Sequence, residues 1–192
     1  AKPASGAWHF SEADVPEKAR RYLGVAGEQA RRRYASAEAL DYLNRALALT
    51  PEDEPEERYG LLLARQAVYD LLSDRENQGQ DLDSLDALAR LLRDPRRQAE
   101  VALARTLHAD RIGAYRESAV HAQAAIELAA GVANVEQEAT GYQRWGRALL
   151  NLSDYGESRA KLERALELAN GANLQRVKDD RLHSLGVEPS FR

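Results

Sequence analysis

The chain has 192 residues, of which 44% are hydrophobic and 30% charged, with a formal net charge of −4. This composition is that of a folded globular protein, and the acidic balance argues against nucleic-acid binding. Cysteine is absent, which excludes disulfides, thiol catalysis and thiolate metal ligands. No apolar run approaches about 20 residues, so we expect no membrane span and a cytoplasmic location. Methionine is absent even at the first position, which indicates a fragment of a longer protein.

Helix-forming residues dominate, and short breaks such as TPEDEPEE, RDPRR and AGVAN divide the chain. Between the breaks, apolar residues recur every three or four positions, as in Leu82, Leu85, Leu88 and Leu92. Asp94-Pro95 has the pattern of a helix cap followed by a first-turn proline. The pattern predicts nine helices, at about 16–34, 36–49, 55–72, 76–93, 96–111, 114–130, 133–152, 155–170 and 173–185.

One residue pattern recurs in the predicted helices. Segments 34–49, 113–128 and 153–168 align without gaps and share small residues at two positions. Segment 73–88 fits between the first two, with glutamine and leucine at those positions, and the spacings are then 39, 40 and 40 residues. A helix pair cannot bury a recurring face alone, so the pairs are expected to stack into an all-α solenoid. The small residues are Ala39, Ala46, Ser118, Ala125, Ser158 and Ala165.

A second set of residues precedes these at a constant interval. Gly27 precedes Ala39 by the same number of residues as Gly146 precedes Ser158. Trp145 is next to Gly146, and Tyr155 begins the last helix of the repeats. This pattern resembles the tetratricopeptide repeat, over roughly residues 16–170. The resemblance implies a right-handed α–α superhelix of about four helix pairs plus a C-terminal helix. Small residues would allow close helix contact, and the two aromatic side chains would fill gaps between layers.

The repeats are not uniform. In the second repeat Gln66, Gln78 and Leu85 replace the small residues, which predicts a wider angle or a longer second helix. The period of 40 also exceeds the usual value of about 34 residues, and a HEAT- or armadillo-like array is the structural alternative. We expect residues 1–15 to be the tail of a truncated helix and a linker, and 171–192 to be a capping helix and tail. The expected repeats are about 16–50, 55–93, 96–130 and 133–170.

Segment 26–72 also resembles the helical repeats that follow the nucleotide-binding module of large bacterial signalling ATPases, nucleotide cyclases and transcriptional regulators. That resemblance implies a sensing or partner-binding arm of a larger protein. The partner would be a protein or peptide, possibly another domain of the parent chain. An exposed terminal repeat could also support a homodimer.

No catalytic pattern is present. The sequence has no nucleophile elbow, phosphate loop or zinc-protease pattern. His108, His121 and Asp110 lack the spacing of a metal site, and the acidic cluster at 52–57 is explained by its place at a helix N-terminus. We therefore expect no enzyme activity, no metal and no cofactor.

In a tetratricopeptide array the first helix of each pair lines a concave groove, where a peptide would bind. The alternative is an anionic small molecule or nucleic acid bound by the arginine-rich first helix, at Arg21, Arg31 and Arg32. The lysine and asparagine set that grips chaperone tails in this family is absent, so chaperone binding is not predicted. The groove residues carried over are Arg21, Glu28, Arg31, Leu63, Ala67, Asp70, Leu103, Leu107, Asp110, Gln143, Arg147 and Leu150.

Overall fold

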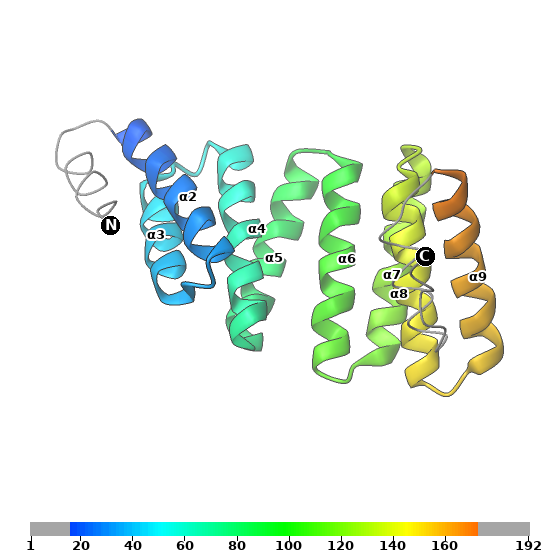
Figure 1. Ribbon diagram of the computed structural model, residues 1–192. Helices are drawn as coiled ribbons and strands as arrows, with labels where there is room; N and C mark the ends of the chain where they lie inside the picture. The colour runs from blue at the N-terminus through cyan, green and yellow to red at the C-terminus, as the bar shows by residue number, and fades with distance from the viewer. Residues whose placement is uncertain (1–15, 173–192) are drawn as a thin grey trace, which may run out of the picture. The chain divides into compact units, whose positions relative to one another are not determined.

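The computed structural model describes residues 16–172, which form helices joined by turns (Figure 1). Eight predicted helices are confirmed, each to within two residues at either end. The ninth, at 173–185, lies outside the described residues. The helices are α2 (Pro16–Arg32), α3 (Ser36–Leu49), α4 (Pro55–Leu72), α5 (Arg75–Leu91), α6 (Pro95–Arg111), α7 (Tyr115–Gly131), α8 (Val135–Asn151) and α9 (Tyr155–Gly171).

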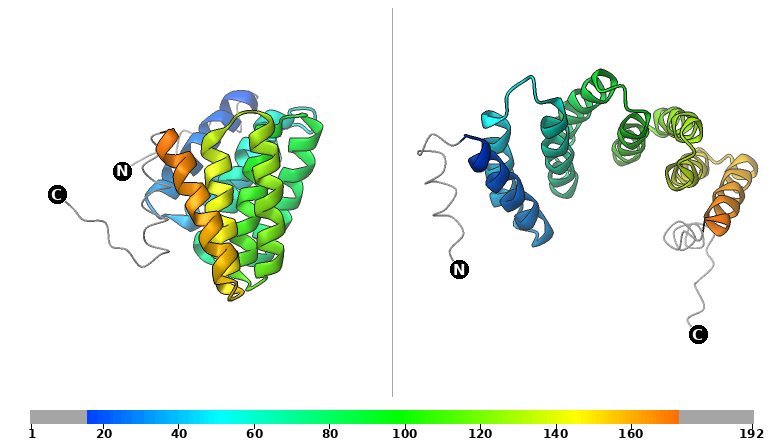
Figure 2. Two further views of the ribbon diagram at one scale, coloured as in Figure 1. Left: turned by 90° about the vertical axis from the view of Figure 1, so that its right-hand side faces the viewer. Right: turned by 90° about the horizontal axis from the view of Figure 1, so that it is seen from above.

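The chain divides after Leu92 into two compact units. In the N-terminal unit α2 packs on α3, α3 on α4 and α4 on α5. In the C-terminal unit α6 packs on α7, α7 on α8 and α8 on α9, and consecutive helices run antiparallel (Figure 2). Within the units, α2 also contacts α4, and α6 contacts α8. We call α2, α4, α6 and α8 the first helices, because each opens one helix pair.

The turn within each helix pair has one recurring geometry. The α8–α9 turn is an example: Ser153 has a left-handed φ of 64°, and the Asp154 N–H donates to Leu149 O at 3.0 Å. These features define a Schellman motif, which satisfies carbonyls at the end of the helix. The Asp154 side chain then accepts from the N–H of Glu157 and caps the next helix. In the turns within the four helix pairs the left-handed residues are Tyr34, Ser73, Gly113 and Ser153, and Arg93 and Ala133 are left-handed in turns between pairs.

Proline and aspartate start α6 as predicted. Pro95 is its first residue, and the Asp94 carboxylate accepts from the N–H groups of Arg96 and Arg97. The connection between α3 and α4, by contrast, is a longer turn that begins at Thr50 and ends at Glu54. Side-chain caps therefore explain where α5, α6, α8 and α9 begin.

Small residues lie where paired helices meet. A Cβ atom on Gly146 would lie 2.7 Å from Leu162 Cγ and 3.2 Å from Ser158 O, which is too close for a packed side chain. The Ser158 hydroxyl donates to Gly146 O at 2.7 Å across the same contact. Gly27 is the equivalent position in α2, where a Cβ would lie 2.8 Å from Leu43 Cγ and 3.5 Å from Ala39 O. Glycine at these two positions allows the helices to approach each other.

The second helix pair has larger side chains at the equivalent contact between its two helices. Gln78 is buried, and its Nε2 donates to Gln66 Oε1 at 3.4 Å between α4 and α5. The expected lengthening of the second helix is wrong, because α5 has 17 residues, as do α7 and α9. A hydrogen bond between the two amides satisfies polar groups that would otherwise be buried at a cost. Ala39, Ala46, Ser118, Ala125 and Ala165 are all fully buried.

The two aromatic residues predicted to fill gaps at the end of the array, Trp145 and Tyr155, differ in how deeply they are buried. Trp145 is half-buried, stacks on Tyr142 with ring centroids 6.4 Å apart, and lies 4.3 Å below Lys161 Nζ. The expectation that Tyr155 fills a gap between layers is corrected, since it is 66% exposed. The reason is its place in the first turn of α9, where most neighbouring side chains are also exposed.

Candidate binding surface on the first helices

An open pocket of about 420 Å³ lies between the first helices of the N-terminal unit, α2 and α4. We call it the first-helix pocket. Among the predicted groove residues of this unit, Arg21 and Glu28 line it, whereas Arg31, Leu63, Ala67 and Asp70 do not. Further lining residues are Arg20, Gly24, Val25, Leu43, Glu56, Glu57, Gly60, Leu61 and Ala64.

Two glycines shape this pocket. A Cβ on Gly24 would lie 3.2 Å from Leu61 Cδ2, so this glycine allows α2 and α4 to approach. A Cβ on Gly60 would meet no atom within 4 Å, so Gly60 leaves its side of the pocket open. Val25 is 55% exposed and supplies an apolar surface beside them. The combination offers both space and an apolar contact for another chain.

One buried arginine of the pocket pairs with acidic residues at the start of α4. Arg20 Nη2 donates to Glu54 at 2.8 and 2.9 Å, and only 9% of the Arg20 side chain is exposed. Arg20 Nε lies 3.2 Å from Glu57 Oε2, close enough for an ion pair although the direction does not make a hydrogen bond. Burial raises the pKa of Glu57 above its ordinary value, and the hydrogen bond with Glu54 raises it further. This arginine links α2 to the start of α4.

Two arginines of the run at the end of α2 share one carboxylate, so the charge of the run is neutralised only in part. Arg31 donates from Nε and Nη2 to both Glu28 oxygens at 2.8 and 2.7 Å, and Arg32 Nε donates to Glu28 at 3.0 Å. The hydrogen bond from Arg31 lowers the pKa of Glu28 below its ordinary value. Two of the three arginines that the anion hypothesis requires therefore share one carboxylate. This pairing gives Arg31 and Arg32 a structural role at the end of α2.

Replacement of Glu28 by glutamine is expected to lower the free energy of unfolding by about 0.5–1 kcal/mol at pH 7, the usual range for a surface ion network. Because folding lowers the pKa of Glu28, its stabilisation is present above the unfolded value of 4.5 and disappears as the pH falls below it. Urea denaturation at pH 7 and pH 3 measures this. A Glu28→Gln effect of equal size at both pH values would contradict the assignment.

The groove residues predicted in the C-terminal unit differ from one another in their burial and surroundings. Leu103 lines a pocket of about 300 Å³ between α6 and α8, together with Glu100 and Gln137. Leu107 and Asp110 are half-buried, and Arg147 is exposed. Asp110 Oδ1 is buried and accepts no hydrogen bond from the described part of the chain.

Gln143 requires a correction. It was predicted to present its side chain in the groove, but it is only 3% exposed. The helical period places Gln143 on the same stripe as Ala139 and Gly146, four residues before and three after, and both of these are buried. Gln143 is therefore part of the packed surface of α8.

Gly60 was not predicted as a binding residue, and neither was a second, larger pocket of about 620 Å³ on another face of α4. Gly60 could have been noticed, because a glycine inside an amphipathic helix costs stability and needs a reason. The larger pocket had no such signal, since its residues come from three helices and follow no pattern in the sequence.

Within residues 16–172, no group of three or more histidine, aspartate or glutamate side chains is arranged to hold a metal ion. None of the helices in this range is both long enough and apolar enough to span a bilayer.

The fold and the paired helices define a class: the chain is an all-α helical-repeat protein with a TPR-like architecture. No protein-family model matches the sequence, and no curated protein matches it. Solved structures do resemble it. BtubC from P. vanneervenii has a TM-score of 0.69 at 12% identity, over 98% of this chain and 90% of that one.

A Rap protein complexed with competence and sporulation factor has a TM-score of 0.71 at 18% identity. The match covers 94% of this chain and 51% of the Rap chain, so this chain spans about half the length of that protein. At these identities the likeness concerns the fold alone.

Proposed function

We propose that the chain is a non-catalytic interaction module that binds a peptide or protein segment on its first helices. The observation that carries this proposal is the first-helix pocket, where Gly24 and Gly60 leave space beside exposed Val25. An apolar anchor on the partner would fill that space, and the charge of Arg21 would orient its backbone or polar groups. The similar Rap protein, solved in complex with competence and sporulation factor, supports this proposal.

The module would belong to a larger bacterial signalling or regulatory protein and would act in the cytoplasm. Its partner is either another protein or another domain of the parent chain. Residues 16–170 would be the repeat region, with the helix pairs as its units. The predicted groove residues Arg31, Leu63, Asp70, Leu103, Leu107, Asp110 and Arg147 stay part of this proposal, as does a homodimer through the terminal repeat.

Gly60→Tyr is expected to weaken peptide binding at least tenfold. The Cβ position of Gly60 is open, so the new ring would project into the first-helix pocket and would occupy the space of the partner without disturbing the core. A peptide selected against the wild-type chain from a random displayed library serves as the probe, and its affinity for each variant is measured by fluorescence anisotropy.

Gly156→Tyr is the matched control, because Gly156 also has an open Cβ position but lies on α9. It should bind the selected peptide as the wild type does. If Gly60→Tyr and Gly156→Tyr bind every selected peptide equally, the first-helix pocket is not the binding site.

A further inference from the structure

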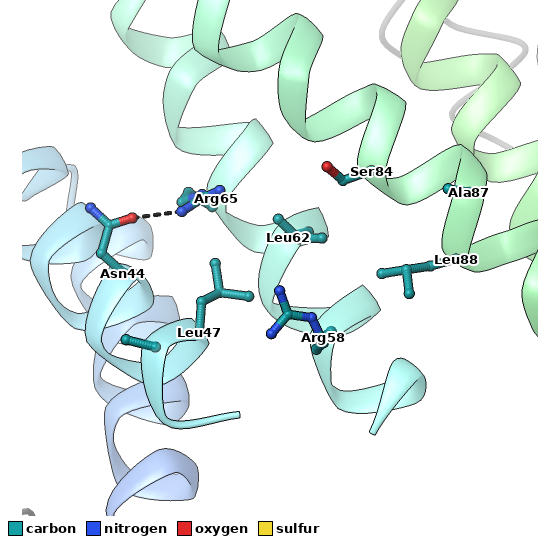
Figure 3. Close-up of a pocket in the computed structure, with 9 residues that line it drawn as sticks. Asn44, Leu47, Arg58, Leu62, Arg65, Ser84, Ala87 and Leu88 are labelled. Carbon is teal, nitrogen blue, oxygen red and sulfur yellow. Dashed lines mark hydrogen bonds between the residues drawn. The ribbon is translucent and has the colours of Figure 1, made fainter. Parts of the chain in front are cut away.

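The larger pocket of the N-terminal unit lies on a face of α4 that the first-helix pocket does not use. We call it the arginine pocket. It has a volume of about 620 Å³ and lies between α3, α4 and α5 (Figure 3). The α4 residues that line it are Arg58, Leu62 and Arg65, whereas Gly60, Leu61 and Ala64 line the first-helix pocket. The two pockets share no residue.

One side of the arginine pocket is apolar. Leu47 of α3, Leu62 of α4 and Leu88 of α5 point toward a common space (Figure 3). Leu47 and Leu62 are largely buried, so their positions are held by the surrounding core. Ala87 of α5 also lines the pocket and is exposed. Three leucines from three helices form a site for an aliphatic group.

Arg65 forms a fixed polar edge to this space. Its Nε and Nη2 donate to the two oxygens of Asp81 at 2.9 and 2.6 Å, and its Nη1 donates to Asn44 Oδ1 at 2.7 Å. Asp81 is buried and does not line the pocket, and its charge balances that of Arg65, so this ion pair is close to neutral as a unit. Arg65 therefore contributes oriented N–H groups rather than net charge.

Arg58 supplies the net charge of the pocket. It is half-buried, and its Nη1 donates to Thr50 O at 2.9 Å. No acidic residue lines the pocket, and no carboxylate of the described residues forms an ion pair with Arg58. Its guanidinium lies beside Leu47 and Leu62 (Figure 3). An unneutralised cation next to an aliphatic surface matches an anion that carries an aliphatic group.

We propose that the arginine pocket binds a carboxylate attached to an aliphatic chain, with the carboxylate on Arg58 and the aliphatic part on Leu47, Leu62 and Leu88. Either the C-terminal end of a peptide or a free aliphatic acid carries this chemistry. The site is independent of the first-helix pocket, since neither proposal requires the other.

The test uses the full ¹⁵N-labelled chain and four probes: octanoate, acetyl-Ala-Ala-Leu with a free carboxylate, octanamide and acetyl-Ala-Ala-leucinamide. Both acids have the proposed chemistry, and both amides lack the charge. Amide chemical shifts are followed by NMR during titration. An acid that binds should shift resonances of residues 44–48, 58–65 and 84–88, and its neutral amide should bind at least tenfold more weakly.

Arg58→Ala should weaken acid binding about tenfold or more, because a charge-assisted hydrogen bond is lost. Arg33→Ala is the matched control: Arg33 Nε also donates to a backbone carbonyl, that of Gln29 at 3.3 Å, and it does not line the pocket. If Arg58→Ala unfolds because the hydrogen bond to Thr50 is lost, Ala87→Phe is the variant that tests the pocket. It keeps both arginines, fills the pocket from an exposed position and should abolish binding, whereas exposed Ala160→Phe on α9 should not.

The outcomes are distinct. If only octanoate binds, the natural ligand is a free acid. If only the peptide acid binds, the ligand is a chain terminus. If both bind, the shared chemistry of a carboxylate and an aliphatic group is supported. If neither acid shifts these resonances, if the amides bind as well as the acids, or if Ala87→Phe leaves binding unchanged, the proposal is overturned.

Discussion

Gly146→Leu is expected to lower the free energy of unfolding by about 3 kcal/mol, at the upper end of the usual cost of overpacking a core. Even the first added atom would lie 2.7 Å from Leu162 Cγ and 3.2 Å from Ser158 O. Leu162 is buried and Ser158 O is a backbone atom, so neither can move without separating α8 from α9. The hydrogen bond from Ser158 to Gly146 O would then be lengthened or lost. Urea denaturation followed by circular dichroism measures the change.

Gly156→Leu is the matched control for this effect. Gly156 is also a helical glycine, but a Cβ there would meet no atom within 4 Å. Its replacement should leave stability unchanged or raise it by up to about 1 kcal/mol, because glycine is a poor helix former. Equal effects of the two substitutions would show that close contact at Gly146 does not limit the packing of α8 and α9.

Asp81→Ala is expected to cost about 3 kcal/mol of folding free energy, the lower end of the range for breaking a buried ion pair. Asp81 is 3% exposed and accepts two hydrogen bonds from Arg65, which in turn is largely covered. Removal of the carboxylate leaves the Arg65 guanidinium with its single hydrogen bond to Asn44. Because Arg65 forms an edge of the arginine pocket, the same change should also disturb binding there.

Asp86→Ala provides the comparison on the same helix. Asp86 pairs with Arg90 at 3.0 Å in an i, i+4 arrangement in which most of the Arg90 side chain is exposed. Such a pair contributes about 0.3–0.5 kcal/mol, so this change should be nearly neutral. The double variant Asp81→Leu with Arg65→Met should recover most of the loss, since no unpaired charge remains. If the double variant loses as much stability as Asp81→Ala, packing and not charge causes the effect.

Helix positions could be predicted closely because their causes are local. Asp94 and Pro95 are adjacent, and the cap and first turn of α6 depend only on them and the next two residues. The repeat could be found for a related reason, since a spacing of 39 or 40 residues is visible without knowledge of contacts. The close contact between α8 and α9 likewise depends on small residues that recur in the sequence.

Surface exposure was predicted less well. Gln143 was expected to line the groove because the first helix of each pair does so in tetratricopeptide arrays, yet it is buried beside Ala139 and Gly146 on α8. A helical period identifies a stripe but does not determine how wide the packed stripe is. That width depends on how closely neighbouring helices approach, which is a property of the assembled unit.

The sequence by itself determined the class of this protein: helices begin and end through caps and turns, and recurring small residues specify that they pair. Only the tertiary structure decided the candidate sites. Arg20 and Glu54 are 34 residues apart, and Arg65 and Asp81 are 16 apart, yet each pair forms an ion pair between different parts of the N-terminal unit. The pockets beside them are spaces left between helices. Their size follows from side-chain volumes at several contacts together, which no single stretch of sequence contains.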